Sequence, residues 1–219
     1  MTRQLITRPG ALQAPQLDYF LLDGSGSMMP KWTNTLASLA AFRDVMMAAH
    51  AHSHAVLQVF DSGELSRIER DALLAAWPSY ANAFIRCPGG GTPLYDAINY
   101  MARSLRELDP PKASIVIITD GYENGSRYTQ LAQAEALLNW CRAKGWQVTF
   151  LGCDFNNARQ AKALGARPEN SIGVRAELME EAGKLLGQRR LRHMRTDEDI
   201  NFTDEEKRDF GGYLTGPST

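Results

Sequence analysis

The sequence has no long apolar run and few cysteines. No stretch of its 219 residues approaches the roughly 20 consecutive apolar residues that a membrane-spanning helix needs. Residues 1–16 mix arginine, glutamine and proline and lack the continuous apolar core of a secretory signal. The three cysteines, Cys87, Cys141 and Cys153, form no C-x-x-C pair, which argues against a disulfide framework and a zinc site. We therefore expect no membrane span and a location in the reducing cytoplasm.

The sequence also carries little net charge. Its 24 lysine and arginine residues are balanced by 25 aspartate and glutamate residues, which gives a formal net charge of -1. A balance of this kind provides no long-range attraction to nucleic acid or to anionic lipid. We expect no nucleic-acid partner.

Motifs of nucleotide-binding and hydrolytic enzymes are missing. The sequence contains no phosphate-binding G-x-x-x-x-G-K-[ST] loop, and residues 24–29 break the dinucleotide fingerprint at its third glycine. Residues 23–27 begin with aspartate where the nucleophile elbow of hydrolases, G-x-S-x-G, requires glycine. These absences disfavour enzymes of both classes.

What the sequence does contain is an alternation of strand-like and helix-like segments. The apolar run from Ile115 to Ile118 is typical of a strand buried on both faces, as in a parallel sheet between two helix layers. The pattern predicts a three-layer, doubly wound α/β fold with a mostly parallel sheet. Strands are expected at residues 18–22, 55–60, 114–119, 148–153 and 171–174, and helices at residues 35–51, 93–108, 130–143, 158–164 and 176–187.

The segment between residues 62 and 88 is less regular. It contains a short candidate strand at residues 65–68 and a helical stretch near residues 71–77. For the whole chain we expect an N-terminal extension at 1–16, one domain at 17–190, and a polar C-terminal extension at 191–219. The C-terminal extension is expected to pack at the periphery or to be partly disordered, because it is rich in charged residues.

Three segments place oxygen-bearing side chains in loops. Asp23, Ser25 and Ser27 alternate with glycines directly after the first predicted strand, Thr92 follows a run of three glycines, and Asp120 ends the strand at 114–119. Ligands of open α/β sheets bind at the carboxyl edge of the sheet, where the order of the strands reverses. Hard dications such as Mg²⁺ prefer oxygen ligands. The five residues therefore predict one metal site at this edge.

The same residues resemble the von Willebrand factor A domains with a metal-ion-dependent adhesion site. That site has the pattern Asp-x-Ser-x-Ser followed by a distant threonine and a distant aspartate, matched here by Asp23, Ser25, Ser27, Thr92 and Asp120. The resemblance covers roughly residues 17–187 and is greatest to compact bacterial or phage stand-alone members. It implies binding of Mg²⁺, or of Mn²⁺ or Ca²⁺ in its place, with one coordination position open to an aspartate or glutamate of a partner protein. It also implies that the last helix of the domain moves when the metal coordination changes.

Residues around the motif are candidates for a partner-binding rim. Met28, Met29 and Trp32 directly follow the first loop, and Tyr122 and Glu123 follow the last ligand. An alternative is that the methionines and the tryptophan pack beneath the first helix as part of the core.

Two other functions remain open from the sequence. One is a metal-assisted hydrolase, although no histidine, lysine or cysteine in the ligand motifs offers a general base or a nucleophile, so we expect no enzyme. The other is a structural or assembly subunit in which the metal only holds the loops together. The preferred prediction is a metal-dependent protein-protein interaction module.

Overall fold

The described part of the chain contains one mixed sheet. The computed structural model describes residues 16–63, 67–79 and 89–211. In these residues the strand order is β3-β2-β1-β4-β5-β6, and every neighbouring pair is parallel except the antiparallel pair of β2 and β3. The strands are β1 (Gln16–Asp23), β2 (Ser53–Phe60), β3 (Arg67–Leu73), β4 (Lys112–Thr119), β5 (Gln147–Cys153) and β6 (Ser171–Val174).

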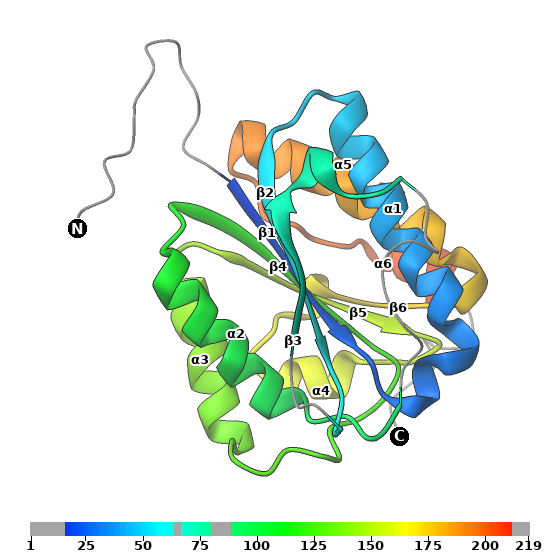
Figure 1. The fold of residues 1–219 in the computed structure, drawn as a ribbon. Helices are drawn as coiled ribbons and strands as arrows, with labels where there is room; N and C mark the ends of the chain where they lie inside the picture. The colour runs from blue at the N-terminus through cyan, green and yellow to red at the C-terminus, as the bar shows by residue number, and fades with distance from the viewer. Residues whose placement is uncertain (1–15, 64–66, 80–88, 212–219) are drawn as a thin grey trace.

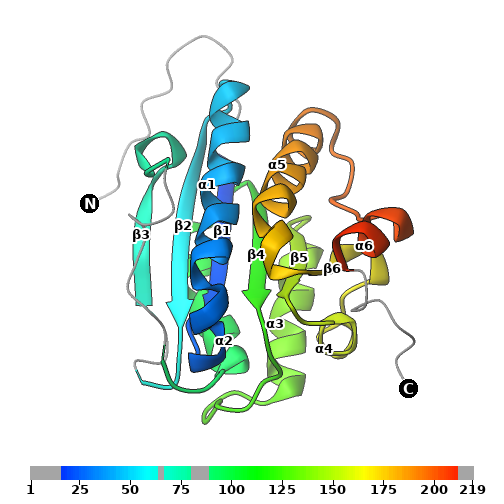
Figure 2. The ribbon, with the colours of Figure 1, turned by 90° about the vertical axis from the view of Figure 1, so that its right-hand side faces the viewer.

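Helices cover both faces of this sheet (Figures 1 and 2). One layer contains α1 and α5, which pack along each other, and the other contains α2 and α3. The predicted three-layer, mostly parallel α/β fold is therefore confirmed. The helices are α1 (Trp32–Ala48), α2 (Leu94–Leu108), α3 (Leu131–Ala143), α4 (Ala158–Ala163), α5 (Met179–Thr196) and α6 (Asp204–Gly211), with short 3-10 helices at η1 (Gly26–Lys31), η2 (Leu74–Ala76), η4 (Pro168–Asn170) and η5 (Ala176–Leu178). Across the described ranges, no helix combines the length and apolarity that crossing a membrane requires.

The central strand β1 shows why two layers form. All eight of its residues are buried, and their side chains alternate between the two faces of the sheet. Tyr19 and Leu21 join the core beneath α2 and α3, whereas Phe20 and Leu22 join the core beneath α1 and α5. A strand with apolar residues on both faces is stable only when both faces are covered.

The third strand differs from the prediction. Residues 71–73, expected to be helical, belong to β3, and only Leu74–Ala76 forms a helical turn. The backbone of β3 pairs with the edge of β2, from His54 opposite Leu73 to Val59 opposite Arg67. This pairing satisfies the hydrogen bonds of a polar segment that packs little apolar surface. Of the strand predicted at residues 65–68, residues 67 and 68 belong to β3, and residues 65 and 66 lie outside the described residues.

The C-terminal segment is part of the packed structure as far as residue 211. Helix α5 continues through the predicted domain boundary at residue 190 and ends at Thr196. Beyond it, Ile200 and Phe202 are 0% and 3% exposed and join the core beneath α1 and α5. Helix α6 then packs beside β6. Residues 1–15 of the expected N-terminal extension and residues 212–219 of the expected C-terminal extension lie outside the described residues.

A buried ion pair connects α5 to β1. The Arg190 Nε donates to Asp18 Oδ1 at 2.7 Å, and Arg190 Nη2 donates to Gln16 Oε1 at 3.0 Å. The side chains of Arg190 and Asp18 are 0% and 1% exposed. The pair lies at the edge of the sheet where β1 begins, opposite the edge with the predicted metal ligands.

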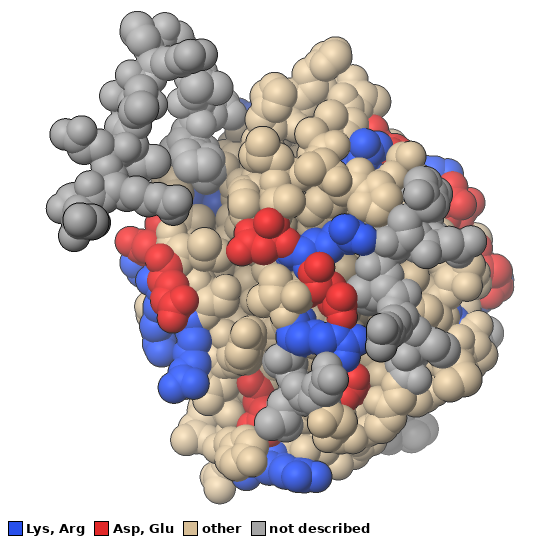
Figure 3. All heavy atoms as spheres, in the orientation of Figure 1, with Lys and Arg blue, Asp and Glu red and all other residues tan. Residues whose placement is uncertain are grey.

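Charged residues are mixed on the surface. On the face drawn in Figure 3, lysine and arginine side chains alternate with aspartate and glutamate. The distribution on this face agrees with the small net charge of the sequence.

Candidate metal centre

The two predicted carboxylate ligands come from neighbouring strands at the centre of the sheet. Asp23 is the last residue of β1, and Asp120 directly follows β4. The register places Leu22 opposite Ile118, so the two strands end side by side. The order of strands reverses between β1 and β4, because β2 and β3 lie on one side and β5 and β6 on the other. Ligands bind at such a point in open α/β sheets.

Three of the predicted donors are in contact. The hydroxyl oxygens of Ser25 and Ser27 lie 3.1 Å apart, and the Ser27 hydroxyl donates to Asp120 Oδ1 at 2.7 Å. In an octahedron with oxygens 2.0–2.1 Å from a Mg²⁺ ion, neighbouring ligand oxygens are about 2.8–3.0 Å apart. The spacing of these three side chains is therefore close to what an oxygen-coordinated dication requires.

The Asp23 carboxylate is fixed by the protein itself. Its Oδ1 accepts the Ser25 backbone N–H at 2.8 Å, and its Oδ2 accepts the Thr119 hydroxyl at 2.6 Å. Burial raises the pKa of Asp23 to about 6, although these hydrogen bonds act in the opposite direction. A nearby cation would favour the charged form, so this buried carboxylate is suited to a metal site.

The glycine-rich loop before α2 is hydrogen-bonded to the first loop. The Gly26 N–H donates to the Gly90 carbonyl at 2.9 Å, and the Gly89 N–H donates to the Gly24 carbonyl at 2.8 Å. Gly90 has a φ of +82°, a conformation that other residues adopt with strain. Thr92, two residues further, is 2% exposed. The sequence order Gly-Gly-Gly-Thr thus brings Thr92 to the same edge of the sheet.

The loop after β4 is attached to Thr92 and to the start of α2. The Thr92 N–H donates to Asn124 Oδ1 at 2.8 Å. Glu123 accepts the backbone N–H groups of Gly125 and Ser126 with one oxygen and that of Tyr95 with the other. Its carboxylate therefore holds the loop and the first turn of α2, and its predicted role in a partner-binding rim stays a prediction.

Of the four remaining candidates for the partner-binding rim, two are buried and two are exposed. Met28 and Trp32 are 0% and 7% exposed and belong to the core beneath α1 and α5, so for these two the alternative of core packing holds and the rim prediction is wrong. Both side chains pack against the sheet because α1 and the preceding η1 cover this face of it. Met29 and Tyr122 are 55% and 52% exposed. Their contact with a partner stays a prediction.

The sequence reasoning missed Lys31, whose ammonium lies inside the site. Its Nζ lies 2.6 Å from Asp120 Oδ2, and the side chains of Lys31 and Asp120 are 20% and 0% exposed. Desolvation lowers the pKa of Lys31, but the hydrogen bond and the charge of Asp120 more than compensate, so this pKa is raised. The only available signal was that Lys31 follows the ligand loop closely and ends the short helical segment that begins in it.

The donor set fits a hard dication. Within the described ranges, no group of three or more histidine, cysteine, aspartate or glutamate side chains is placed to hold a metal. The candidate centre instead combines two carboxylates with hydroxyl oxygens. All of these donors are oxygens, as Mg²⁺, Mn²⁺ and Ca²⁺ prefer. The residues that would hold the ion are Asp23, Ser25, Ser27, Thr92 and Asp120.

Comparison with known proteins finds similarity in structure only. Neither a protein-family model nor a curated protein sequence matches the chain. Among solved structures, the von Willebrand factor domain of the type V pili tip protein Mfa5 from Porphyromonas gingivalis has a TM-score of 0.68 at 12% identity, covering 89% of this chain and 100% of that one. The pilus adhesin SpaC from Lactobacillus rhamnosus GG has a TM-score of 0.67 at 12% identity, covering 81% of this chain. This chain spans 30% of the length of SpaC.

A third similar structure was solved with manganese bound. Manganese-loaded TRAP protein from Plasmodium vivax has a TM-score of 0.56 at 15% identity, covering 78% of this chain and 74% of that one. A von Willebrand factor type A structure from Catenulispora acidiphila has a TM-score of 0.59 at 14% identity, covering 80% of this chain and 42% of that one. At these identities the comparison establishes the fold alone. The chain therefore has the α/β fold of von Willebrand factor A domains.

Proposed function

We propose that this chain is a metal-dependent protein-binding module. A divalent cation, Mg²⁺ or in its place Mn²⁺ or Ca²⁺, is held by Asp23, Ser25, Ser27, Thr92 and Asp120. The observation that carries the proposal is the contact of Ser25, Ser27 and Asp120 at oxygen spacings of 2.7 and 3.1 Å. These donors meet at the reversal point of the sheet, where α/β folds bind ligands.

The chemistry of the donors supports an acidic partner. Three of the five predicted ligands are neutral hydroxyls, so an ion bound there keeps much of its positive charge. An aspartate or glutamate carboxylate of a partner protein would then complete its coordination. Similar folds in a pilus adhesin, a pilus tip protein and a manganese-loaded protein support a metal and a protein partner. The proposal is for binding without catalysis, and the cytoplasmic location stays a prediction from the sequence.

Metal binding is the first test. Mg²⁺ and Mn²⁺ are titrated by calorimetry into chelator-treated protein and into the variants Asp23→Asn and Ser25→Ala. We expect one saturable site in the native protein and its loss in both variants. The matched control is Asp44→Asn, which removes one carboxylate whose side chain is 54% exposed on α1 and should bind as the native protein does. A folded native protein that binds neither ion would contradict the proposal.

The open coordination position is tested separately. Bound Mn²⁺ enhances the relaxation of water protons when water occupies its coordination shell, and acetate serves as a model of the partner carboxylate. We expect acetate to lower this enhancement in the native protein, because it displaces water from the ion, whereas chloride at equal ionic strength does not. A purely structural metal would show the same relaxation with both salts.

A further inference from the structure

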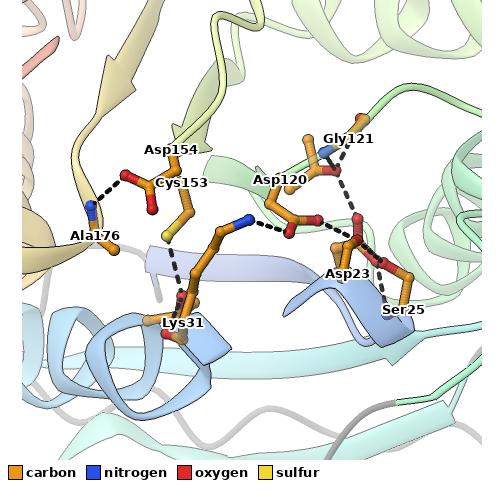
Figure 4. A network of polar contacts seen from close by, with 11 residues as sticks. Asp23, Ser25, Lys31, Asp120, Gly121, Cys153, Asp154 and Ala176 are labelled. Carbon is orange, nitrogen blue, oxygen red and sulfur yellow. Dashed lines mark hydrogen bonds and ion pairs between the residues drawn. The ribbon is translucent and has the colours of Figure 1, made fainter. Parts of the chain in front are cut away.

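The two oxygens of the Asp120 carboxylate have different partners, the Ser27 hydroxyl and the Lys31 ammonium. Oδ1 of Asp120 accepts the Ser27 hydroxyl at 2.7 Å, and Oδ2 lies 2.6 Å from the Lys31 ammonium (Figure 4). Lys31 closes η1, the 3-10 helix that begins within the ligand loop, so its backbone is fixed close to the site. The carboxylate therefore has a positively charged partner supplied by the chain.

The ammonium changes the charge of the site. Asp23 and Asp120 together contribute -2, and Lys31 reduces the sum of these three groups to -1. A buried carboxylate is costly without a counter-charge, and Asp120 is fully buried at its side chain. The positive charge of Lys31 also disfavours binding of a divalent cation to the same carboxylate, because like charges repel strongly where water is excluded.

We propose that Lys31 is a built-in counter-cation of Asp120 that weakens binding of the divalent cation at this site. The inference rests on the proposed metal function and adds a regulating residue to it. In the protein without metal, Lys31 neutralises Asp120 and keeps the ligand loops together. A divalent cation must share the carboxylate with this ammonium or displace it, so the affinity of the site is lower than its oxygen donors alone would give.

Other groups near Lys31 do not replace Asp120 as its partner. Asp154 contributes to the electrostatic environment of Lys31, but its Oδ1 accepts the Ala176 N–H at 2.8 Å and so holds the start of η5. The Cys153 thiol accepts a hydrogen bond from the Thr35 hydroxyl, with 3.6 Å between sulfur and oxygen. The direct ion pair of Lys31 in the structure is with Asp120.

The first test measures metal affinity with the charge removed. Lys31→Met keeps much of the side-chain length without the charge, and Lys31→Gln keeps a hydrogen-bond donor without the charge. We expect Mn²⁺ to bind both variants at least about tenfold more tightly than the native protein, the size of effect that one close charge has on a proton equilibrium. Lys31→Arg keeps the positive charge and should stay near the native affinity. Native affinity in both neutral variants would overturn the inference while leaving the metal site established.

The second test does not depend on metal. In chelator, we expect Lys31→Met to melt several degrees below the native protein, because Asp120 loses its counter-charge. In an Asp120→Asn background, the same substitution should cause little further change, since the carboxylate is already absent. Equal melting temperatures of the native protein and Lys31→Met in chelator would overturn the inference. If neither the native protein nor the neutral variants bind metal, the proposed function is contradicted together with the inference. If all of them bind metal with the same affinity, the inference alone is contradicted.

Discussion

Asp23 makes metal binding sensitive to pH. Burial raises the pKa of this carboxyl to about 6, so protons compete with a cation for it in mildly acidic solution. We predict that Mg²⁺ affinity falls as the pH is lowered through 6, by about tenfold for each pH unit well below it. Calorimetric titrations at about pH 7.5 and about pH 5 would measure the change. An affinity that is the same at both pH values would show that Asp23 does not take part.

Some of the site was readable from the sequence because its signals are local. Asp23, Ser25 and Ser27 lie within five residues, and Asp120 ends an apolar run, so the position of each at a strand end follows from the pattern. Lys31 was not predicted because its partner lies 89 residues away, and only the pairing of β1 with β4 brings the two together. The hydrogen bonds of Glu123 were not predicted for a related reason, since an exposed acidic residue in a loop and one that accepts backbone N–H groups look alike in sequence.

Among the larger elements, the buried strands were predictable, whereas the extent of the edge strand was not, since a strand was expected at residues 65–68 and β3 continues to Leu73. β1 and β4 are buried along nearly their whole length, and their runs of apolar residues predict buried strands. β3 instead has only half-buried or exposed residues, and its sequence, from Arg67 to Leu73, contains four charged side chains. Its conformation comes from pairing with the open edge of β2, which no local pattern records.

The contact between α1 and α5 depends on a glycine in α5. A Cβ added at Gly183 would lie 2.1 Å from the backbone oxygen of Ser38 in α1, so the helices would have to separate. We predict that Gly183→Ala lowers the free energy of unfolding by about 1–3 kcal/mol or more. Urea denaturation measures the loss. Gly187→Ala is the control with a smaller effect, because its nearest neighbour is the Val45 side chain at 3.0 Å. Native stability in Gly183→Ala would mean that the helices are less closely packed than described.

The end of α5 gives the fold a dependence on pH. Burial lowers the pKa of His193, and its Nδ1 is hydrogen-bonded to the Glu198 carbonyl at 2.8 Å. The unfolded chain therefore takes up a proton near pH 6.5 while the folded protein resists it, so this stabilisation is present above about 6.5 and is lost as the pH falls below it. The groups that act on His193 include Arg190 and Lys112, which oppose its protonation, and Asp197, which favours it.

We predict that His193→Asn reduces this pH dependence. Asparagine keeps a nitrogen donor near the position of Nδ1 but does not titrate. The free energy of unfolding, measured in urea at about pH 7.5 and about pH 5.5, should fall less in the variant than in the native protein. Identical decreases in the two proteins would show that His193 is not responsible.

For the molecule as a whole, the segment after α5 completes the core. The sequence suggested a polar extension because Ile200 and Phe202 are isolated among charged residues, yet both are buried against the α1 and α5 layer. Two apolar side chains at alternate positions are too few to indicate an element by periodicity. The two side chains become buried only because the chain turns back toward the sheet after α5.

We predict that Phe202→Ala lowers the free energy of unfolding by about 3–5 kcal/mol, the range for truncating a buried phenylalanine. The control is Phe210→Ala in α6, which removes a ring that is only partly buried against the same core and should cost less. Denaturation followed by circular dichroism and by tryptophan fluorescence should give one coincident transition in each protein. A Phe202→Ala variant as stable as the native protein would place the segment outside the cooperative unit.

The buried pair of Arg190 and Asp18 limits how the last long helix can move. Sliding α5 by one turn is a translation of about 5.4 Å, which would leave both charges buried without partners. Breaking such a pair costs about 3–5 kcal/mol, so a slid helix would be populated at less than about 1% unless a ligand supplied that free energy. The helix begins near the metal edge and is anchored at the opposite edge. Any ligand-linked movement of α5 that preserves this ion pair would therefore have to leave the register of the helix against β1 unchanged.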